Sequence, residues 1–208
     1  AKYTSAKNKY SLGNNNELTV SIKGRASGLT EVIKSYTFTR NSHLVKVQQL
    51  VKNTSNKTIE WRQYNTLSRG EETEGSVMLY TYTGAAYFDS EDKFNKIDFS
   101  DIEDESFQKV VKTSWISMIQ HYFFTAWLPS DKSSDKKTIY TRLLVDDNKN
   151  SYQIGSVDDY IALSPGESQS FDSKLYIGPK VQAEIKDLAP GLALTVDYGV
   201  LTFLAAPL

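Results

Sequence analysis

The side chains best suited to acid–base or metal chemistry are few and scattered. The chain has two histidines and no cysteine, which excludes disulfides, thiolate metal sites and cysteine nucleophiles. His43 follows the turn-like pair Asn41-Ser42, and this position predicts a solvated residue at the start of a strand. His121 lies inside an aromatic run, where a hydrogen-bonded structural histidine is the favoured interpretation. No spacing typical of metal ligands joins either histidine to the other or to carboxylates.

Two acidic clusters, Glu71–Glu74 and Asp101–Glu105, are the other candidates for chemistry. Paired carboxylates can bind calcium or serve a glycosidase. The first cluster lies between Gly70 and Gly75 and lacks the aspartate spacing of a calcium-binding loop, so solvated loops are the better interpretation of both. The sequence also has no nucleophile elbow, phosphate-binding loop or dinucleotide fingerprint. We therefore expect a protein that is not an enzyme, without catalytic, cofactor-binding or metal-binding residues.

Aromatic residues offer a second kind of binding chemistry, with 13 Tyr, 9 Phe and 3 Trp among 208 residues. Tyr and Trp rings could line a sugar-binding groove, but the filling of sheet faces explains most of them. The net charge is −1, from 24 Lys plus Arg against 25 Asp plus Glu. A chain so balanced has no broad basic field, and no nucleic-acid partner is expected.

The elements that must position these residues are mainly strands. Leu18, Val20 and Ile22 alternate with polar residues, as a strand with one buried face requires. The pattern repeats up to Ile59 and Trp61, which predicts a meander of antiparallel strands. Turn-like residues separate four later strand-like segments: Thr138–Val145, Ser151–Val157, Tyr160–Leu163 and Ser168–Ile177. About ten strands must stack or close, because one flat sheet would leave an apolar face in water. The expected fold class is mainly β, a large antiparallel β-sandwich.

The segment Trp115–Leu128 suits either a buried helix or a strand, and its β-branched and aromatic content favours a strand. Within it, Trp115, Tyr122, Phe124 and Trp127 have apolar neighbours on both sides. We expect all four to be core residues and not a ligand platform.

One helix is expected near the end of the chain, over about 179–188. Pro179 stands in its predicted first turn, apolar residues recur at helical spacing, and Pro190-Gly191 ends it. The architecture predicted from the sequence is therefore many strands followed by a short helix.

Four separated stretches resemble one known family. They are Gly84–Tyr87 followed by Phe94–Phe99, Trp115–Phe123 with Ala126–Pro129, Tyr176–Lys180, and Leu194–Gly199. In order and spacing they resemble the periplasmic domain between the first and second membrane helices of YidC-type membrane protein insertases of Gram-negative bacteria. Ser114 and Val200 depart from the family, which commonly has Gly and Trp there. The structural family motif is taken as Gly84, Tyr87, Trp115, Tyr122, Phe123, Trp127, Gly178 and Pro179.

The resemblance implies a β-supersandwich related to galactose mutarotase-like and sugar-binding folds, with a short helical end and further strands upstream of Ala1. It implies an accessory domain at the periplasmic face of the inner membrane, which helps to insert and fold inner-membrane proteins, alone or with the Sec translocon. The implied partners are periplasmic Sec components, nascent membrane proteins and the protein's own membrane domain, with no cofactor. The alternative is a carbohydrate-binding or mutarotase-like protein, on fold analogy and tyrosine content.

The expected domain covers residues 1–199, and residues 200–208 are expected to begin a membrane-interfacial segment in contact with a lipid surface. Between them, Asp197-Tyr198-Gly199 is predicted to be a hinge, since glycine permits a turn and tyrosine suits an interface. The apolar residues of Val200–Leu208 have no polar partner face. A final strand packed on the sandwich is the alternative, because apolar residues already alternate over 192–196.

Overall fold

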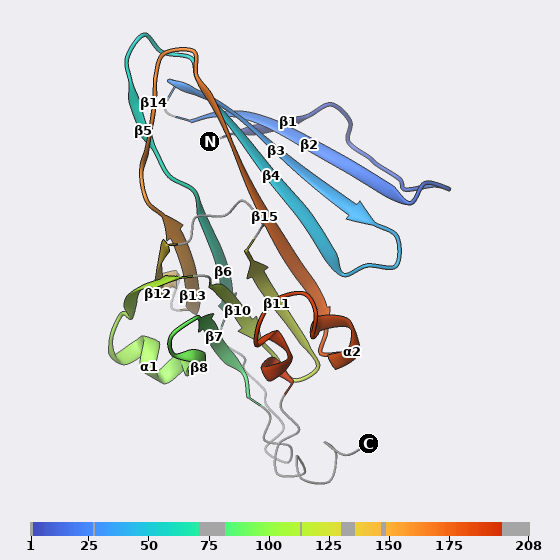
Figure 1. Ribbon diagram of the computed structural model, residues 1–208, viewed down its shortest axis with the longest axis vertical. Coiled ribbons are helices and arrows are strands. Elements are labelled where there is room, and N and C mark those ends of the chain that lie inside the picture. Colours follow the sequence, from blue (N-terminus) through green and yellow to red (C-terminus); the bar gives the residue numbers. More distant parts are fainter. Residues whose placement is uncertain are drawn as a thin grey trace.

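Three antiparallel sheets form the molecule, and the computed structural model describes them over residues 2–26, 28–70, 82–112, 114–129, 136–146 and 149–196 (Figure 1). In spatial order, the nine-stranded sheet contains β1 (Tyr3–Ser5), β2 (Glu17–Ala26), β3 (Thr30–Thr39), β4 (Leu44–Asn53), β15 (Ser168–Pro179), β11 (Phe123–Leu128), β10 (Trp115–Ile119), β7 (Gly84–Asp89) and β8 (Lys93–Ile97). The four-stranded sheet contains β6 (Tyr64–Gly70), β13 (Lys149–Asp158), β12 (Lys136–Asp146) and β9 (Gln108–Lys112). The third sheet pairs β14 (Ile161–Leu163) with β5 (Ile59–Trp61). A mainly β antiparallel sandwich is thus confirmed.

The first hairpins follow the alternation of the sequence. Hydroxyl pairs cross β2 and β3 on their polar face, with Thr19 bonded to Thr37 and Ser21 to Ser35, each at 2.8 Å. The turn into β4 places Asn41 at a φ of 56°, a left-handed conformation that Asn tolerates better than most residues. The predicted turn at this point is confirmed.

The meander predicted up to Ile59 and Trp61 is wrong in its last step. After β4 the next neighbour in the sheet is β15, which comes from the far end of the chain and pairs with β4 from Ser168 to Tyr176. Strand β5 leaves this sheet and pairs with β14. The described residues hold fifteen strands, more than the expected ten or so, because several strands are only three residues long.

The ambiguous segment 115–128 is a hairpin of two strands, β10 and β11, which confirms the strand preference. The prediction that its aromatic residues are core residues is confirmed for Trp115 and Phe124, which are almost fully buried. It is wrong for Tyr122, which lies in the turn and is exposed, and Trp127 is only partly buried. The difference arises because the turn interrupts the strand and removes Tyr122 from its alternation.

The nine-stranded sheet carries apolar clusters on both faces. On one face, β7 and β10 pack against the four-stranded sheet through Ile116, Met118, Ile139 and Ile154. At the far end of that same face, β5 and β14 cover Val32 and other apolar residues of β3 and β4. The opposite face near β10 and β11 carries a third cluster, whose cover comes from the C-terminal residues Ile185, Ala189 and Leu192.

The C-terminal segment is less helical than predicted. Helix α2 covers only Gln182–Ile185, and Pro179, expected in its first turn, is the last residue of β15. A 3-10 helix, η1 (Leu192–Thr195), replaces the alternative strand over 192–196. Leu192 and Thr195 are buried at a spacing of three residues, whereas Leu194 is exposed. Packing on Trp115, whose indole N–H donates to the Pro190 carbonyl at 2.8 Å, sets this conformation.

Among the acidic clusters, Asp101–Glu105 was expected to be a loop and that expectation is wrong. The residues Phe99–Asp104 form helix α1, which buries Ile102 against the four-stranded sheet. The Asp101 carboxylate accepts a hydrogen bond from the Asp98 N–H at 3.2 Å, so one acidic residue caps the helix. Glu71–Glu74, the hinge residues Asp197, Tyr198 and Gly199, and the segment Val200–Leu208 lie outside the described residues. No helix within the described ranges is long and apolar enough to cross a membrane.

Asp89 stabilises the tight turn between β7 and β8. Its buried carboxylate accepts hydrogen bonds from the N–H groups of Glu91 and Asp92, at 2.7 and 2.6 Å, and lies 3.0 Å from the Lys109 ammonium. Burial alone would raise the pKa of Asp89, but these donors outweigh it and hold the pKa below its ordinary value of 3.8.

Asp89→Asn should therefore be less stable than the parent chain at neutral pH, by an amount that shrinks as the pH falls. The folded pKa is depressed, so the carboxylate stabilises the fold fully above the unfolded pKa and loses this effect as the pH drops through the folded pKa. Urea unfolding of both proteins at neutral pH and below about pH 4 measures the difference. A difference that stays constant over this range would contradict the assignment.

Candidate functional site

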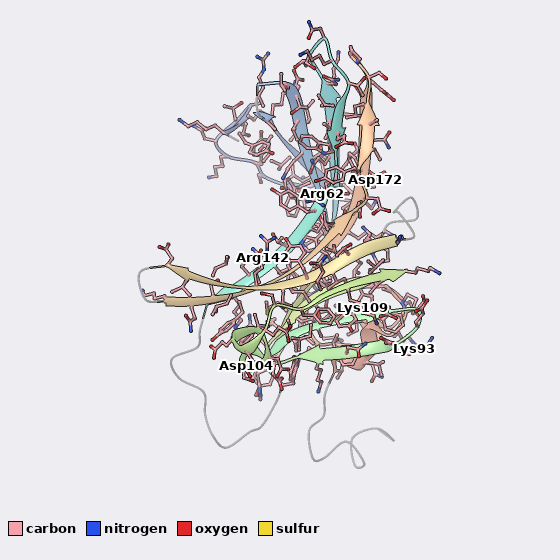
Figure 2. The ribbon with its side chains drawn as sticks, turned by 90° about the vertical axis from the view of Figure 1, so that its left-hand side faces the viewer. Arg62, Lys93, Asp104, Lys109, Arg142 and Asp172 are labelled. Atoms are coloured by element: carbon pink, nitrogen blue, oxygen red, sulfur yellow. The ribbon has the colours of Figure 1, made fainter. Side chains whose placement is uncertain are left out.

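The outward face of the four-stranded sheet carries an open groove of about 740 Å³. Alternation along the strands creates it, since Ile139 and Ile154 point into the core while Tyr140 and Gln153 point away from it. Residues at or next to the ends of β5, β6, β9 and β14 complete the lining. The six side chains used below are Arg62, Tyr64, Tyr140, Arg142, Gln153 and Tyr160. Figure 2 shows Arg142 on the four-stranded sheet with Arg62 above it, on the same side of the molecule.

Two arginines lie over tyrosine rings in this groove. The guanidinium carbon of Arg62 is 4.4 Å from the centroid of the Tyr160 ring, and that of Arg142 is 4.9 Å from the Tyr140 ring. Stacking of this kind orients the planar guanidinium and leaves its N–H edges available to an acceptor. Burial raises the pKa of Tyr140, although the nearby Arg142 lowers it. The Tyr140 hydroxyl is therefore a neutral donor at physiological pH.

Gly155 makes room for one of these rings. It is paired with Tyr140 across β13 and β12, and a Cβ atom at this position would collide with the Tyr140 ring. The glycine thus allows the ring to lie against the sheet and hold Arg142 over it.

The groove suits binding better than catalysis. Its lining combines aromatic faces and guanidinium donors with a single carboxylate, Glu60, and contains no histidine. An acid–base mechanism needs two positioned proton-transfer groups or an activated nucleophile. No cluster of three potential metal-binding side chains occurs in the part of the chain that the structure describes.

Neither histidine lies in the groove. His43 is exposed just before β4, as predicted, and its Nδ1 is 3.1 Å from the Glu184 carboxylate on α2. His121 lies in the β10–β11 turn, with its ring edge against Tyr122 at a centroid distance of 3.9 Å. The two histidines therefore make separate contacts, in different parts of the structure.

The family-motif residues come together in the half of the nine-stranded sheet that runs from β15 to β7, and not in the groove. Gly84 and Tyr87 are in β7, and the others follow on the adjacent strands β10, β11 and β15 or on the turn between β10 and β11: Trp115, Tyr122, Phe123, Trp127, Gly178 and Pro179. At Gly178 a side chain would collide with the His43 ring. Most of these residues therefore build the sheet.

The groove residues were not predicted from the sequence. A signal was present, since Arg62 and Tyr64 are two residues apart, as are Tyr140 and Arg142, so each pair shares one face of an extended segment. What the spacing does not reveal is that these pairs and Tyr160 meet, because β13 and β6 pair only in the folded chain.

The fold is that of a β-supersandwich domain with an open groove on one face. A solved structure of a galactose mutarotase related enzyme from Lactobacillus acidophilus shares this fold, with a TM-score of 0.53 at 9% identity, over 86% of this chain and 71% of that one. The family model for the YidC periplasmic domain matches residues 1–208, and the chain belongs to this family.

Curated relatives agree with the family assignment. Membrane protein insertase YidC of Methylobacillus flagellatus is 37% identical over 208 residues, covering 99% of this chain and 37% of the relative. The protein of the same name from Thioalkalivibrio sulfidiphilus is 39% identical over 193 residues, covering 92% of this chain and 34% of the relative. The chain therefore spans little more than a third of the length of these relatives.

Proposed function

We propose that the chain is the periplasmic accessory domain of a membrane protein insertase, which helps to insert and fold inner-membrane proteins, alone or with the Sec translocon. The match of the YidC periplasmic domain family over residues 1–208 is the observation that carries this proposal. The relatives named as membrane protein insertases support it. A domain of this kind acts through its surfaces, so no catalytic residue is assigned.

The groove is the proposed contact for nascent membrane proteins. Segments that cross to the periplasm are poor in Lys and Arg, because positive residues are retained on the cytoplasmic side. A surface with Arg62 and Arg142 and one carboxylate complements such neutral or acidic segments. The rings of Tyr64, Tyr140 and Tyr160 add apolar faces on which an extended chain can pack.

The remaining partners follow from the place of the domain in such a protein. We propose that residues 200–208 begin the connection to its own membrane domain along the lipid surface, with Asp197, Tyr198 and Gly199 as the hinge. Seven of the nine residues in Val200–Leu208 are apolar, which suits a membrane interface. Periplasmic Sec components remain a proposed partner on the basis of the family alone.

A photo-crosslinking experiment tests the groove. This chain would replace the matched segment in the full-length Methylobacillus insertase, with a photoreactive side chain at Tyr64 in the groove or at Lys46 on β4. We expect crosslinks to a nascent inner-membrane protein from position 64 at several times the yield from position 46, because both sites are exposed but only the first borders the arginines.

Two variants sharpen the experiment. Arg62→Gln/Arg142→Gln should lower the yield from position 64, and Gly155→Ala should lower it less, since it only displaces the Tyr140 ring. His43→Gln/His121→Gln is the matched control and should leave the yield unchanged, because neither histidine lies in the groove. Equal yields from positions 64 and 46 would refute the groove as the contact.

The carbohydrate-binding alternative rests on the shared fold alone, and 9% identity does not carry a function across. Calorimetry with common hexoses separates the two functions. Millimolar or tighter binding that is lost in Arg62→Gln/Arg142→Gln would favour the sugar-binding function, whereas we expect no heat of binding.

A further inference from the structure

An exposed apolar surface lies at the β10–β11 turn, and none of its residues lines the groove. Tyr122 in this turn is 67% exposed, and Phe123, the first residue of β11, is 55% exposed. Ile177 of β15 and Val181 just before α2 are exposed as well. These four residues, Tyr122, Phe123, Ile177 and Val181, are called the aromatic tip below. Large apolar side chains grouped on a surface mark a site of interaction more often than scattered ones do.

Strand pairing and one backbone hydrogen bond bring the residues of the tip close together. Thr125 is paired with Ile177, and Phe123 with Pro179, so Phe123 and Ile177 are diagonal neighbours on the same face of the sheet. The Lys180 N–H donates to the Tyr122 carbonyl at 2.9 Å, which places Val181 next to the turn.

The tip is exposed because the cover of this sheet face ends before it. Trp127 and Leu175, a paired couple on β11 and β15, still pack against the four-stranded sheet. The next residues outward on the same face, Ile177 and Phe123, are not part of that cluster. Their neighbour Phe124 points the other way and is buried, so the exposed side chains stand on a well-packed base.

The turn itself is well ordered by local contacts. The Gln120 N–H donates to the Phe123 carbonyl at 2.9 Å, which closes the hairpin. The His121 ring packs edge-on against the Tyr122 ring. An aromatic side chain held outward in this way loses little conformational freedom on contact with a partner.

The position of the tip indicates what covers it. In Figure 1 the β10–β11 turn, α2 and the red C-terminal helical segment lie together near the lower end of the molecule. That segment holds the last described residues, and the apolar run Val200–Leu208 follows within a few residues. Tyr and other aromatic side chains are enriched where proteins meet the headgroups of a bilayer.

We propose that the aromatic tip is a second membrane contact, which inserts Tyr122 and Phe123 into the headgroup region of the phospholipid bilayer. This inference rests on the proposed function, because it takes the domain to lie beside a membrane. Together with the proposed interfacial segment 200–208, such a contact would fix the orientation of the domain on the bilayer as well as its distance from it.

Vesicle flotation of the 208-residue chain tests the proposal, with vesicles of phosphatidylethanolamine and phosphatidylglycerol. Tyr122→Ser/Phe123→Ser should reduce the bound fraction at least about tenfold, because the two aromatic anchors of the tip are lost. The matched control is Tyr64→Ser/Tyr160→Ser, which removes two exposed aromatic rings from the groove, Tyr64 being 67% exposed like Tyr122. The control should bind like the parent chain, and thermal melts of all three proteins check that they fold.

Spin labels test the contact between the tip and the bilayer independently of the fraction of protein bound to vesicles. Since the chain has no cysteine, Tyr122→Cys and Tyr64→Cys can each carry a single nitroxide label. We expect the label at position 122 to gain contact with oxygen dissolved in the bilayer when vesicles are added, and the label at position 64 to stay in water.

The outcomes separate the tip from the function of the domain. The proposal that the tip contacts the bilayer would be overturned if Tyr122→Ser/Phe123→Ser floated with vesicles like the parent chain, or if the control lost as much binding. A label at position 122 that stays in water would overturn it as well. Crosslinking of nascent chains from position 64 is a separate test of the groove. The membrane contact of the tip can therefore be refuted while the proposed function stands.

Discussion

Trp115→Ala is expected to lower the free energy of unfolding by about 3–5 kcal/mol, a large share of the ~5–15 kcal/mol that stabilises a typical domain. The Trp115 side chain is 2% exposed and stacks on the Phe88 ring at a centroid distance of 5.9 Å. Removal of the indole leaves a cavity between β10 and the C-terminal segment that the surrounding strands cannot close.

The loss should extend beyond the cavity itself. The Trp115 indole N–H is the donor to the Pro190 carbonyl, and the same cluster contains Ile185 and Leu192. In Trp115→Ala we therefore expect faster amide hydrogen exchange over residues 182–196 than in the parent chain.

Trp127→Ala is the matched comparison for this prediction. Trp127 is also a tryptophan of the hairpin and also donates to a backbone carbonyl, that of Thr66 at 3.1 Å, but it is only partly buried. Chemical denaturation should show a smaller loss for Trp127→Ala than for Trp115→Ala. Equal losses of unfolding free energy would contradict the expectation that the more deeply buried tryptophan contributes more to stability.

Lys137→Met is expected to cost about 3–5 kcal/mol as well, because it leaves the Asp158 carboxylate buried without its counter-charge. The Lys137 ammonium lies 2.8 Å from the Asp158 carboxylate, and the two side chains are 10% and 12% exposed. They stand directly opposite each other at the end of the β12–β13 pairing. Asp158 is also tied to the neighbouring segment through its N–H, which donates to the Gln63 carbonyl at 3.0 Å.

The Lys137–Asp158 ion pair contributes less to the free energy of unfolding than the cost of removing Lys137 alone suggests. Lys137→Met/Asp158→Leu should recover most of the stability that Lys137→Met loses, since an apolar pair needs no counter-charge. The same cycle on the exposed pair Lys46 and Glu17, with 3.4 Å between the charged atoms, should change stability by at most about 1 kcal/mol. Urea unfolding of both cycles provides the measurement, and a double variant no more stable than Lys137→Met would contradict this account.

The sequence by itself determined the fold class, most of the strands and the family. Period-two alternation and turn residues are local signals, so β2, β3, β12 and β13 could be read directly from their own residues. The same locality explains why His43 was correctly placed as a solvated residue after a turn.

Only the tertiary structure decided where these strands go and what they bring together. The pairing of β4 with β15 joins residues more than 100 positions apart, and no local pattern encodes such a choice. The groove depends on another long-range pairing, that of β6 with β13, which brings Tyr64 beside the hairpin that carries Tyr140 and Arg142.

The tip shows the same limit at a smaller scale. Apolar neighbours on both sides predicted burial of both Tyr122 and Phe124, but the hairpin turn leaves Tyr122 in solvent, with the adjacent Phe123, and only Phe124 in the core. The C-terminal residues 179–196 likewise form β-strand, short helix and 3-10 turn in succession, because burial against Trp115 outweighs their helical spacing. Composition specifies how much apolar surface must be buried, whereas the packing of distant strands decides which side chains remain outside.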